Sequence, residues 1–283
     1  MSRPYAALSL LSLAALAAAP AQARAWSEPG HRIVAAIAEE RLTPAARRLV
    51  REILGATPMS DGDVAAWADA QRDPVTRPWH YVNIPFAATY DLGRDCPREA
   101  CVVAQLERAI AEVRGGDGAV RRGDAFRWLV HLVADVHQPL HAADGRDRGG
   151  NDLQTRRQRG RGQPRPFHRV WDHDVLGPIL RRRGPVAAGL ALARGIPAED
   201  ASRWTADLSP AAWANESHAL ARTLYAELEQ LPRDGQILLL PEAYADRQRA
   251  RTETQLRKAG VRLAALLDRI AVARAAGAGG RSR

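Results

Sequence analysis

The chain has 283 residues, of which 41 are Lys or Arg and 32 are Asp or Glu, so its formal net charge is +9. This positive balance favours a polyanionic partner. Apart from an amino-terminal run, no stretch approaches the ~20 apolar residues that a membrane-spanning helix needs, which excludes an integral membrane protein and predicts no stable membrane association. No linker or internal repeat divides the chain, so its length predicts one large domain.

Residues 1–25 have the organisation of a secretory signal peptide. Arg3 supplies a positive charge ahead of an apolar run, and a small-x-small cleavage site ends at Ala25. Cleavage there would make Trp26 the mature amino terminus and lower the net charge from +9 to +7, because Arg3 and Arg24 leave with no acidic residue. The sequence therefore predicts an exported protein, periplasmic or extracellular.

Helical periodicity predominates after the signal peptide, so we predict an all-α fold with one small extended or hairpin segment. Thr43 and Pro44 mark a helix start, and Gly55 marks a helix end. We expect one folded domain over 26–274 and a disordered basic tail over 275–283. The predicted helices are 33–42, 44–54, 63–71, 102–113, 124–136, 170–182, 197–206, 210–231 and 241–270, and the predicted extended pieces are 79–84 and 152–156.

Two cysteines, Cys96 and Cys101, lie five residues apart in the loop sequence GRDCPREAC. In an exported chain this arrangement favours a small disulfide over a metal site. Because the closed loop would be short, we expect its stabilising effect to be local. The sequence contains no CxxC pair and no signature of a nucleophilic cysteine.

The stretch FRWLVHLVADVHQPLH, residues 126–141, combines the pattern of a buried helix with ionisable side chains. His131 and Asp135 stand at i and i+4, so they share one face and can converge on one cation. Burying an unpaired ionisable group is costly, and a metal ion would satisfy both side chains. A hydrogen-bonded pair would also satisfy them, so this stretch alone leaves both interpretations open. Pro139 ends the regular helix, and His141 leaves it at a new angle.

Metal-ligating residue types recur along the rest of the chain. A free amine at Trp26, with a reference pKa of roughly 7.7 to 8.0, would bind a metal near neutral pH. His168 and Asp172 repeat the i and i+4 spacing of His131 and Asp135. The complete set fits three zinc ions with three or four protein ligands each, which leaves open positions for water and substrate. The candidate ligands are Trp26, His31, Asp69, His80, His131, Asp135, His141, His168 and Asp172.

These segments resemble a known family. WSEPGH, AWAD, WHYVNIP, FRWLVHLVADVHQPLH, GGN and HRVWD follow one another as in the secreted zinc-dependent, single-strand-specific nucleases of the S-one/P-one type from fungi, plants and bacteria. The similarity extends over residues 26–174, and the composition resembles that of a bacterial member. It implies a mostly α-helical fold shared with zinc-dependent phospholipase C, and a disulfide between Cys96 and Cys101.

The resemblance also implies an activity and a metal content. Members of the family cleave single-stranded DNA and RNA to 5′-phosphorylated products and remove 3′-phosphates from nucleotides. Three zinc ions per chain would be shared among the candidate ligands. The first would bind Asp69, His80, His131 and Asp135, the second His141, His168 and Asp172, and the third Trp26, His31 and Asp135.

Zinc would supply the chemistry of the activity that the resemblance implies. A bound zinc lowers the pKa of water to about 7, so a metal-bound hydroxide would attack phosphorus. By resemblance, Arg72 would stabilise the negative charge that builds up there, and Asn151 of the GGN motif would hydrogen-bond a phosphate oxygen. Asn83 departs from the family, because fungal relatives have an aspartate there that pairs with the basic residue matching Arg72. We therefore expect Arg72 to be less constrained.

Two other functions would use similar residues. A zinc-dependent phospholipase C needs an exposed apolar rim around its site, and a non-catalytic zinc-stabilised protein would have closed metal sites. The arginine-rich run from Arg156 to Arg165 lies between Asn151 and His168, so we expect it at the mouth of the site. It would either attract a phosphate backbone or form a solvated loop, and it favours nucleic acid over lipid. No pattern indicates a protein partner.

Overall fold

The computed structural model describes residues 26–115 and 119–279. The signal peptide predicted for 1–25 and residues 280–283 of the predicted tail lie outside the described residues. Helices dominate the described chain, as the sequence predicts. The α-helices are α1 (Glu28–Arg41), α2 (Pro44–Leu54), α3 (Gly62–Ala65), α4 (Leu92–Asp95), α5 (Val102–Gly115), α6 (Ala119–Val136), α7 (Phe167–Asp172), α8 (Gly177–Leu180), α9 (Pro185–Arg194), α10 (Ala198–Thr205), α11 (Pro210–Leu228) and α12 (Tyr244–Gly279).

Short 3-10 helices and short strands connect these helices. The 3-10 helices are η1 (Trp67–Ala70), η2 (Arg77–His80), η3 (Pro97–Glu99), η4 (Pro139–Ala142) and η5 (Asp174–Leu176). The strands are β1 (Gln154–Arg157), β2 (Arg165–Pro166), β3 (Arg233–Asp234) and β4 (Ile237–Leu240). In the described part of the chain, no helix is long and apolar enough to cross a membrane.

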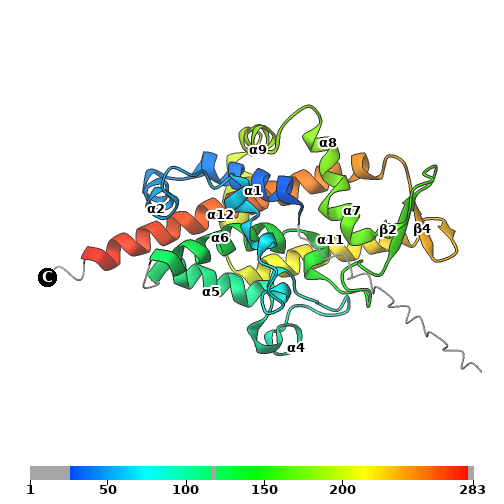
Figure 1. The fold of residues 1–283 in the computed structure, drawn as a ribbon, viewed down its shortest axis with the longest axis horizontal. Helices are drawn as coiled ribbons and strands as arrows, with labels where there is room; N and C mark the ends of the chain where they lie inside the picture. The colour runs from blue at the N-terminus through cyan, green and yellow to red at the C-terminus, as the bar shows by residue number, and fades with distance from the viewer. Residues whose placement is uncertain (1–25, 116–118, 280–283) are drawn as a thin grey trace, which may run out of the picture.

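Helix α6 occupies the centre of the molecule, where it packs against α1, α2, α5, α11 and α12 (Figure 1). The long helix α12, orange to red in Figure 1, extends along most of the molecule. Phe126, Leu129 and Val133 of α6 are fully buried. Burial of each such side chain stabilises the fold by about 1.5–3 kcal/mol, so packing holds α6 firmly in place.

Local signals placed several helix ends where the sequence predicts them. Thr43 caps α2, since its hydroxyl accepts a hydrogen bond from the amide of Ala46 at 3.3 Å. Gly55 follows α2 with a φ of +65°, a conformation that glycine adopts without steric cost. Ser209 caps α11 in the same way, through the amide of Ala212. Each of these residues directly precedes or follows the helix whose start or end it marks.

The helix predicted over 63–71 is interrupted, because a distant side chain uses one of its carbonyl groups. The Ala65 carbonyl accepts a hydrogen bond from His131 Nδ1 at 3.0 Å. The amide of Asp69, which a continuous helix would direct to Ala65, instead donates to Ala66 at 3.1 Å. The chain therefore forms α3 and then η1, and the interruption sets the direction in which Asp69 projects.

The helix predicted over 170–182 is interrupted for the same reason. The backbone carbonyl of Asp172 accepts a hydrogen bond from the Ser27 amide at 2.9 Å, so it is not used by a following turn. The amide of Leu176 donates to His173 instead, and η5 and α8 replace the expected continuous helix. The amino-terminal segment is thereby joined to the end of α7.

Two further differences concern helix extent. The sequence analysis did not predict α9, although Pro185 at its start follows a glycine, a common helix start. Helix α12 continues to Gly279, beyond residue 270 where the sequence predicted its end. Residues 275–279 of the predicted disordered tail are therefore helical, and that expectation was wrong for them.

A small sheet lies at the end of the molecule opposite the last turns of α12 (Figure 1). Its strand order is β2-β1-β4-β3, with β1 antiparallel to β2 and parallel to β4. The sequence predicted only β1 among these strands, because the ILLL run of β4 lacks an alternating polar pattern. Leu238 and Leu240 of β4 are buried, so the strand is defined by burial on its inner face.

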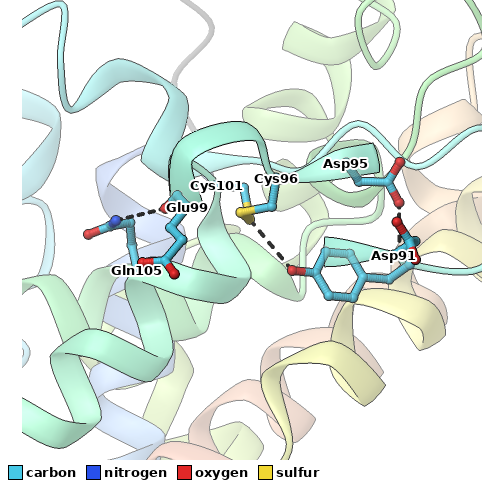
Figure 2. The surroundings of a disulfide bond; sticks show 7 residues. Asp91, Asp95, Cys96, Glu99, Cys101 and Gln105 are labelled. Carbon is cyan, nitrogen blue, oxygen red and sulfur yellow. Dashed lines mark hydrogen bonds between the residues drawn. A yellow bond between two sulfur atoms is a disulfide. The ribbon is translucent and has the colours of Figure 1, made fainter. Parts of the chain in front are cut away.

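The disulfide predicted between Cys96 and Cys101 is present, with an S–S distance of 2.03 Å. It closes the turn between α4 and α5, as Figure 2 shows. The side-chain amide of Gln105 in α5 donates to the carbonyl of Glu99 at 2.8 Å across the same turn. The disulfide therefore stabilises a local connection, as expected from its short loop.

Candidate metal centre

Three groups of ligand-type side chains lie together in the described part of the chain. The first joins α1 to α6, the second joins η1 and η2 to α6, and the third joins η4 to α7. Within each group, one candidate ligand atom per residue lies within 4.8 Å of the others. The groups are His31, His131 and Asp135; Asp69, His80 and His131; and His141, His168 and Asp172.

Backbone carbonyls orient three of the imidazoles. Each carbonyl can only accept, so the Nδ1 atom facing it donates and Nε2 keeps a lone pair in the neutral ring. Metal-ligating histidines are held in this way in many proteins. The pairs are His131 Nδ1 with Ala65 at 3.0 Å, His141 Nδ1 with His80 at 2.7 Å, and His168 Nδ1 with Gly149 at 2.7 Å.

Gly149 in the GGN motif permits one of these contacts. Its φ is +63°, and a Cβ atom there would lie 2.3 Å from the carbonyl oxygen of Leu140. A larger residue would displace the loop whose carbonyl accepts from His168. The motif therefore has a structural role in addition to presenting Asn151.

Asp135 lies between two of the groups and presents one oxygen to each. Its Oδ1 lies 3.5 Å from Nε2 of His31, whereas its Oδ2 lies 3.0 Å from Nδ1 of His80 and 3.3 Å from Nε2 of His131. The carboxylate is fully buried. A buried carboxylate that faces imidazoles on both sides has the geometry required to bridge two cations.

Unpartnered polar atoms support metal binding at this place. Both ring nitrogens of His31 and Oδ1 of Asp135 are buried without a hydrogen-bond partner among the described residues. Orphaned polar atoms of this kind are costly in a folded protein unless a ligand satisfies them. Nε2 of His141 and Nε2 of His168 also face each other at 3.1 Å, although each carries a lone pair. A cation in each of these two groups accounts for the unpartnered atoms of one and the facing nitrogens of the other, so the residues fit a metal centre.

Electrostatics agree with this interpretation. Burial lowers the pKa values of His31, His141 and His168, which keeps these imidazoles neutral, the form that binds metal. Burial raises the pKa of Asp172 to about 8. Burial lowers the pKa of His131, but Asp135 and Asp69 outweigh it and raise that pKa to about 9. Asp172 and His131 therefore hold protons near neutral pH, and a bound divalent cation would supply positive charge in place of those protons.

The predicted amino-terminal ligand lies at the entry to α1. The indole of Trp26 is fully buried and contacts Trp171, with ring centroids 6.4 Å apart. A Cβ atom on Gly30 would lie 2.6 Å from Cβ of Trp26, so the glycine lets the tryptophan pack against the first turn of the helix. This first turn carries His31 into its group.

Two cavities adjoin the metal-ligand groups. The larger, of about 670 Å³, is lined by Asp69 and Arg72 together with the first residues of α1. The other, of about 470 Å³, is lined by His141, His168 and Asn151. The predicted phosphate-binding residues Arg72 and Asn151 therefore lie beside different groups, one in each cavity.

Comparison with known proteins decides the family. The sequence matches the S1/P1 nuclease family over residues 26–272. The chain belongs to this family. It is 26% identical to Nuclease S1 of Aspergillus oryzae over 276 residues, which cover 87% of this chain and 92% of that relative. It is 27% identical to Endonuclease 1 of Arabidopsis thaliana over 277 residues, 87% of each chain. With Endonuclease 2 of Arabidopsis thaliana, 27% identity over 188 residues covers 61% of this chain and 63% of that relative.

Membership of the S1/P1 nuclease family confirms the resemblance that the motifs indicated. The family has a mostly helical fold related to phospholipase C, and its members are zinc-dependent hydrolases with three zinc ions. The three ligand groups suit that metal content. The match favours a nuclease over the phospholipase C and non-catalytic alternatives. The relatives compared are from plants and fungi.

The arginine-rich run of this S1/P1 nuclease pairs with carboxylates outside the three metal-ligand groups. Arg156 is paired with Asp234 at 2.6 Å and Arg165 with Asp174 at 3.1 Å. Both arginines and Arg157 line a separate cavity of about 90 Å³, between the sheet and the start of α12. None of the arginines of the run lines the two cavities that adjoin the metal-ligand groups. The run reaches the cavity of His141 and His168 at Pro166, which follows Arg165, whereas its arginines line neither of these two cavities.

Gln138, which lies between α6 and η4, is a residue of the site that no sequence motif indicated. Its side chain is fully buried, and its Nε2 donates to Oδ1 of Asp172 at 2.8 Å. Its Oε1 accepts from the amide of Leu140 at 2.6 Å. Gln138 thus orients the candidate ligand Asp172. The one sequence signal for this role is its place in HQPLH, three residues before the candidate ligand His141. Asn83, which lines the cavity of His141, forms no hydrogen bond with Arg72 in the described part of the chain.

Proposed function

We propose that the chain is an exported zinc-dependent nuclease. It hydrolyses single-stranded DNA and RNA to 5′-phosphorylated products and removes 3′-phosphates from nucleotides. The observation that carries this proposal is the arrangement of three ligand groups around Asp135 in a member of the S1/P1 nuclease family, with arginine-bearing cavities on both sides. Export to the periplasm or the medium, and the bacterial origin, remain predictions from the sequence.

The ligand groups would hold three zinc ions with Asp135 as a bridge. This assignment adds the amine of Trp26 to the group of His31, because cleavage after residue 25 would free that nitrogen from its peptide bond. The first ion would bind Asp69, His80, His131 and Asp135, the second His141, His168 and Asp172, and the third Trp26, His31 and Asp135.

When bound, zinc acts as a Lewis acid, which lowers the pKa of water and neutralises phosphate charge. The chain's own residues bind and orient the substrate. Arg72 lies in the same cavity as Asp69 and presents a guanidinium to the phosphate at the metal groups. Asn151 uses one amide hydrogen on the Arg148 carbonyl at 2.8 Å, which leaves the other hydrogen for a phosphate oxygen. Tyr81 lines the same cavity as Asn151 and presents a ring on which a base can stack.

The amino terminus provides the test. We would compare the mature protein that begins at Trp26 with the same protein carrying one alanine ahead of Trp26. We expect about three zinc ions per chain and strong hydrolysis of single-stranded DNA in the first protein. The extended protein should lose one zinc ion and most of its activity, because its Trp26 nitrogen is part of a peptide bond.

A matched control carries one alanine after Arg283 and should behave like the mature protein. Full activity and full zinc content in the alanine-extended protein would exclude the amine as a ligand. If neither protein hydrolysed single-stranded DNA or a 3′-nucleotide, the nuclease proposal would be wrong, and phosphatidylcholine would be the next substrate.

A further inference from the structure

The cavity beside the group of His141, His168 and Asp172 contains an arginine to which the proposed reaction gives no role. Arg77 lines this cavity of about 470 Å³ together with His141, His168 and Asn151. Arg72 lines the other cavity, beside Asp69. The metal-ligand groups therefore have a separate arginine on each side.

The position of Arg77 follows from the short helix that carries it. Arg77 is the first residue of η2, and His80 of the second ligand group is the last. Side chains at i and i+3 of a 3-10 helix eclipse one another, so Arg77 projects from the same side as His80, about 6 Å away along the helix axis. Pro78 lies in the first turn and restrains the backbone there. Arg77 is thus held one turn from the metal centre.

The charge of Arg77 is available to a ligand. Its residue is exposed, and no carboxylate within the described ranges forms an ion pair with it. Arg148, which also lines the cavity, is neutralised by Asp152, whose carboxylate accepts two hydrogen bonds from its guanidinium, one of them at 2.9 Å. Arg77 therefore contributes the uncompensated positive charge on this side of the centre.

We propose that Arg77 binds the phosphate adjacent to the one being hydrolysed, so that the site recognises a strand with two neighbouring phosphates. This inference rests on the proposed nuclease function. Arg72 acts on the phosphate at the metal groups, whereas Arg77 acts on the next phosphate along the strand, in the cavity that also holds Tyr81 and Asn151. The guanidinium would bind two phosphate oxygens at once. The site would then prefer oligonucleotides to substrates with one phosphate.

The test compares substrates that differ in phosphate number. We would measure kcat/KM of the mature zinc-loaded protein on a single-stranded oligothymidylate and on a dinucleoside monophosphate, which has a single phosphate. For Arg77→Ala, the ratio of the two values should fall at least about tenfold, mainly through KM on the oligonucleotide, because a charge-assisted contact is lost. The salt dependence of oligonucleotide binding should weaken by about 0.7 in the log–log slope, as expected for one contact to a single strand.

Three comparisons make the result specific. Arg77→Lys should restore part of the ratio, because it keeps the charge but not the bidentate geometry. Arg72→Ala should lower kcat/KM on both substrates together. Arg269→Ala, which removes an exposed arginine from α12, should leave the ratio and the salt slope at their wild-type values.

The inference is overturned if Arg77→Ala leaves the ratio unchanged, whether both activities fall equally or neither falls. Failure of the proposed function would look different. In that case the wild-type protein would hydrolyse neither the dinucleoside monophosphate nor the oligonucleotide.

Discussion

Two regions of this S1/P1 nuclease look equally functional in the sequence but differ in the structure. The histidines and aspartates that follow Leu129 converge in a buried centre, where His131 and Asp135 meet residues from α1, η1 and η2. The arginines of the β1–β2 hairpin instead lie at one end of the molecule, where Arg156 and Arg165 form ion pairs with Asp234 and Asp174. The spacing of the ligand residues thus predicted that they converge, whereas the positive charge of the run did not predict which cavity its arginines line.

The physical difference is how strongly each pattern constrains structure. Burying a carboxylate and an imidazole without partners is costly, so a buried i and i+4 pair requires complementary groups nearby. An exposed arginine is stable in water wherever the chain leaves it, and surface ion pairs contribute little. The following predictions test this contrast between the metal centre and the hairpin.

The largest effect is expected at Asp135, the proposed bridging ligand. Asp135→Asn removes the charge of the carboxylate that faces both His31 and His80. We expect loss of at least one zinc ion and a fall in kcat on the order of 10³-fold or more, because both ions depend on it. Metal analysis and single-stranded DNA hydrolysis would measure this. Asp124→Asn, in the same helix and paired with Arg127, is the control. Wild-type zinc content in Asp135→Asn would contradict the bridging assignment.

An intermediate effect is expected at Gln138, which contacts the candidate ligand Asp172 but is not itself a candidate ligand. Gln138→Ala removes the hydrogen bond that orients Asp172 and also the acceptor for the Leu140 amide in η4, which carries His141. Loss of such a support typically weakens metal binding 10- to 100-fold, so we expect activity that recovers as zinc is raised. Zinc titration of activity is the measurement. The control is Gln163→Ala, an exposed glutamine of the hairpin. Unchanged zinc affinity would show that Asp172 is oriented by other contacts.

The smallest effect is expected from the hairpin. The triple variant Arg157→Ala, Arg159→Ala and Arg161→Ala removes three exposed charges that line neither cavity of the metal centre. At physiological ionic strength, charges are largely screened beyond about 8 Å, so kcat/KM on single-stranded DNA should change less than about twofold. Steady-state kinetics over a range of salt concentrations would decide this. A tenfold fall would mean that the substrate strand reaches the hairpin and that these arginines bind it.

Much of the protein was determined by the sequence alone. Helix caps such as Thr43, the i and i+4 pair of His131 and Asp135, and the short loop of Cys96 and Cys101 depend on residues a few positions apart. Such local interactions act whatever the rest of the chain does, so they can be read directly. The family motifs added the identity of the remaining candidate ligands.

Only the tertiary structure decided the features that depend on distant partners. The predicted helices over 63–71 and 170–182 break because His131 and Ser27 use the carbonyl groups of Ala65 and Asp172. The same kind of contact orients the imidazoles, and long-range packing decides which arginine reaches a cavity. Every residue has the same backbone carbonyl, so the sequence does not show which group will donate a hydrogen bond to it. That donor comes near only when the chain folds.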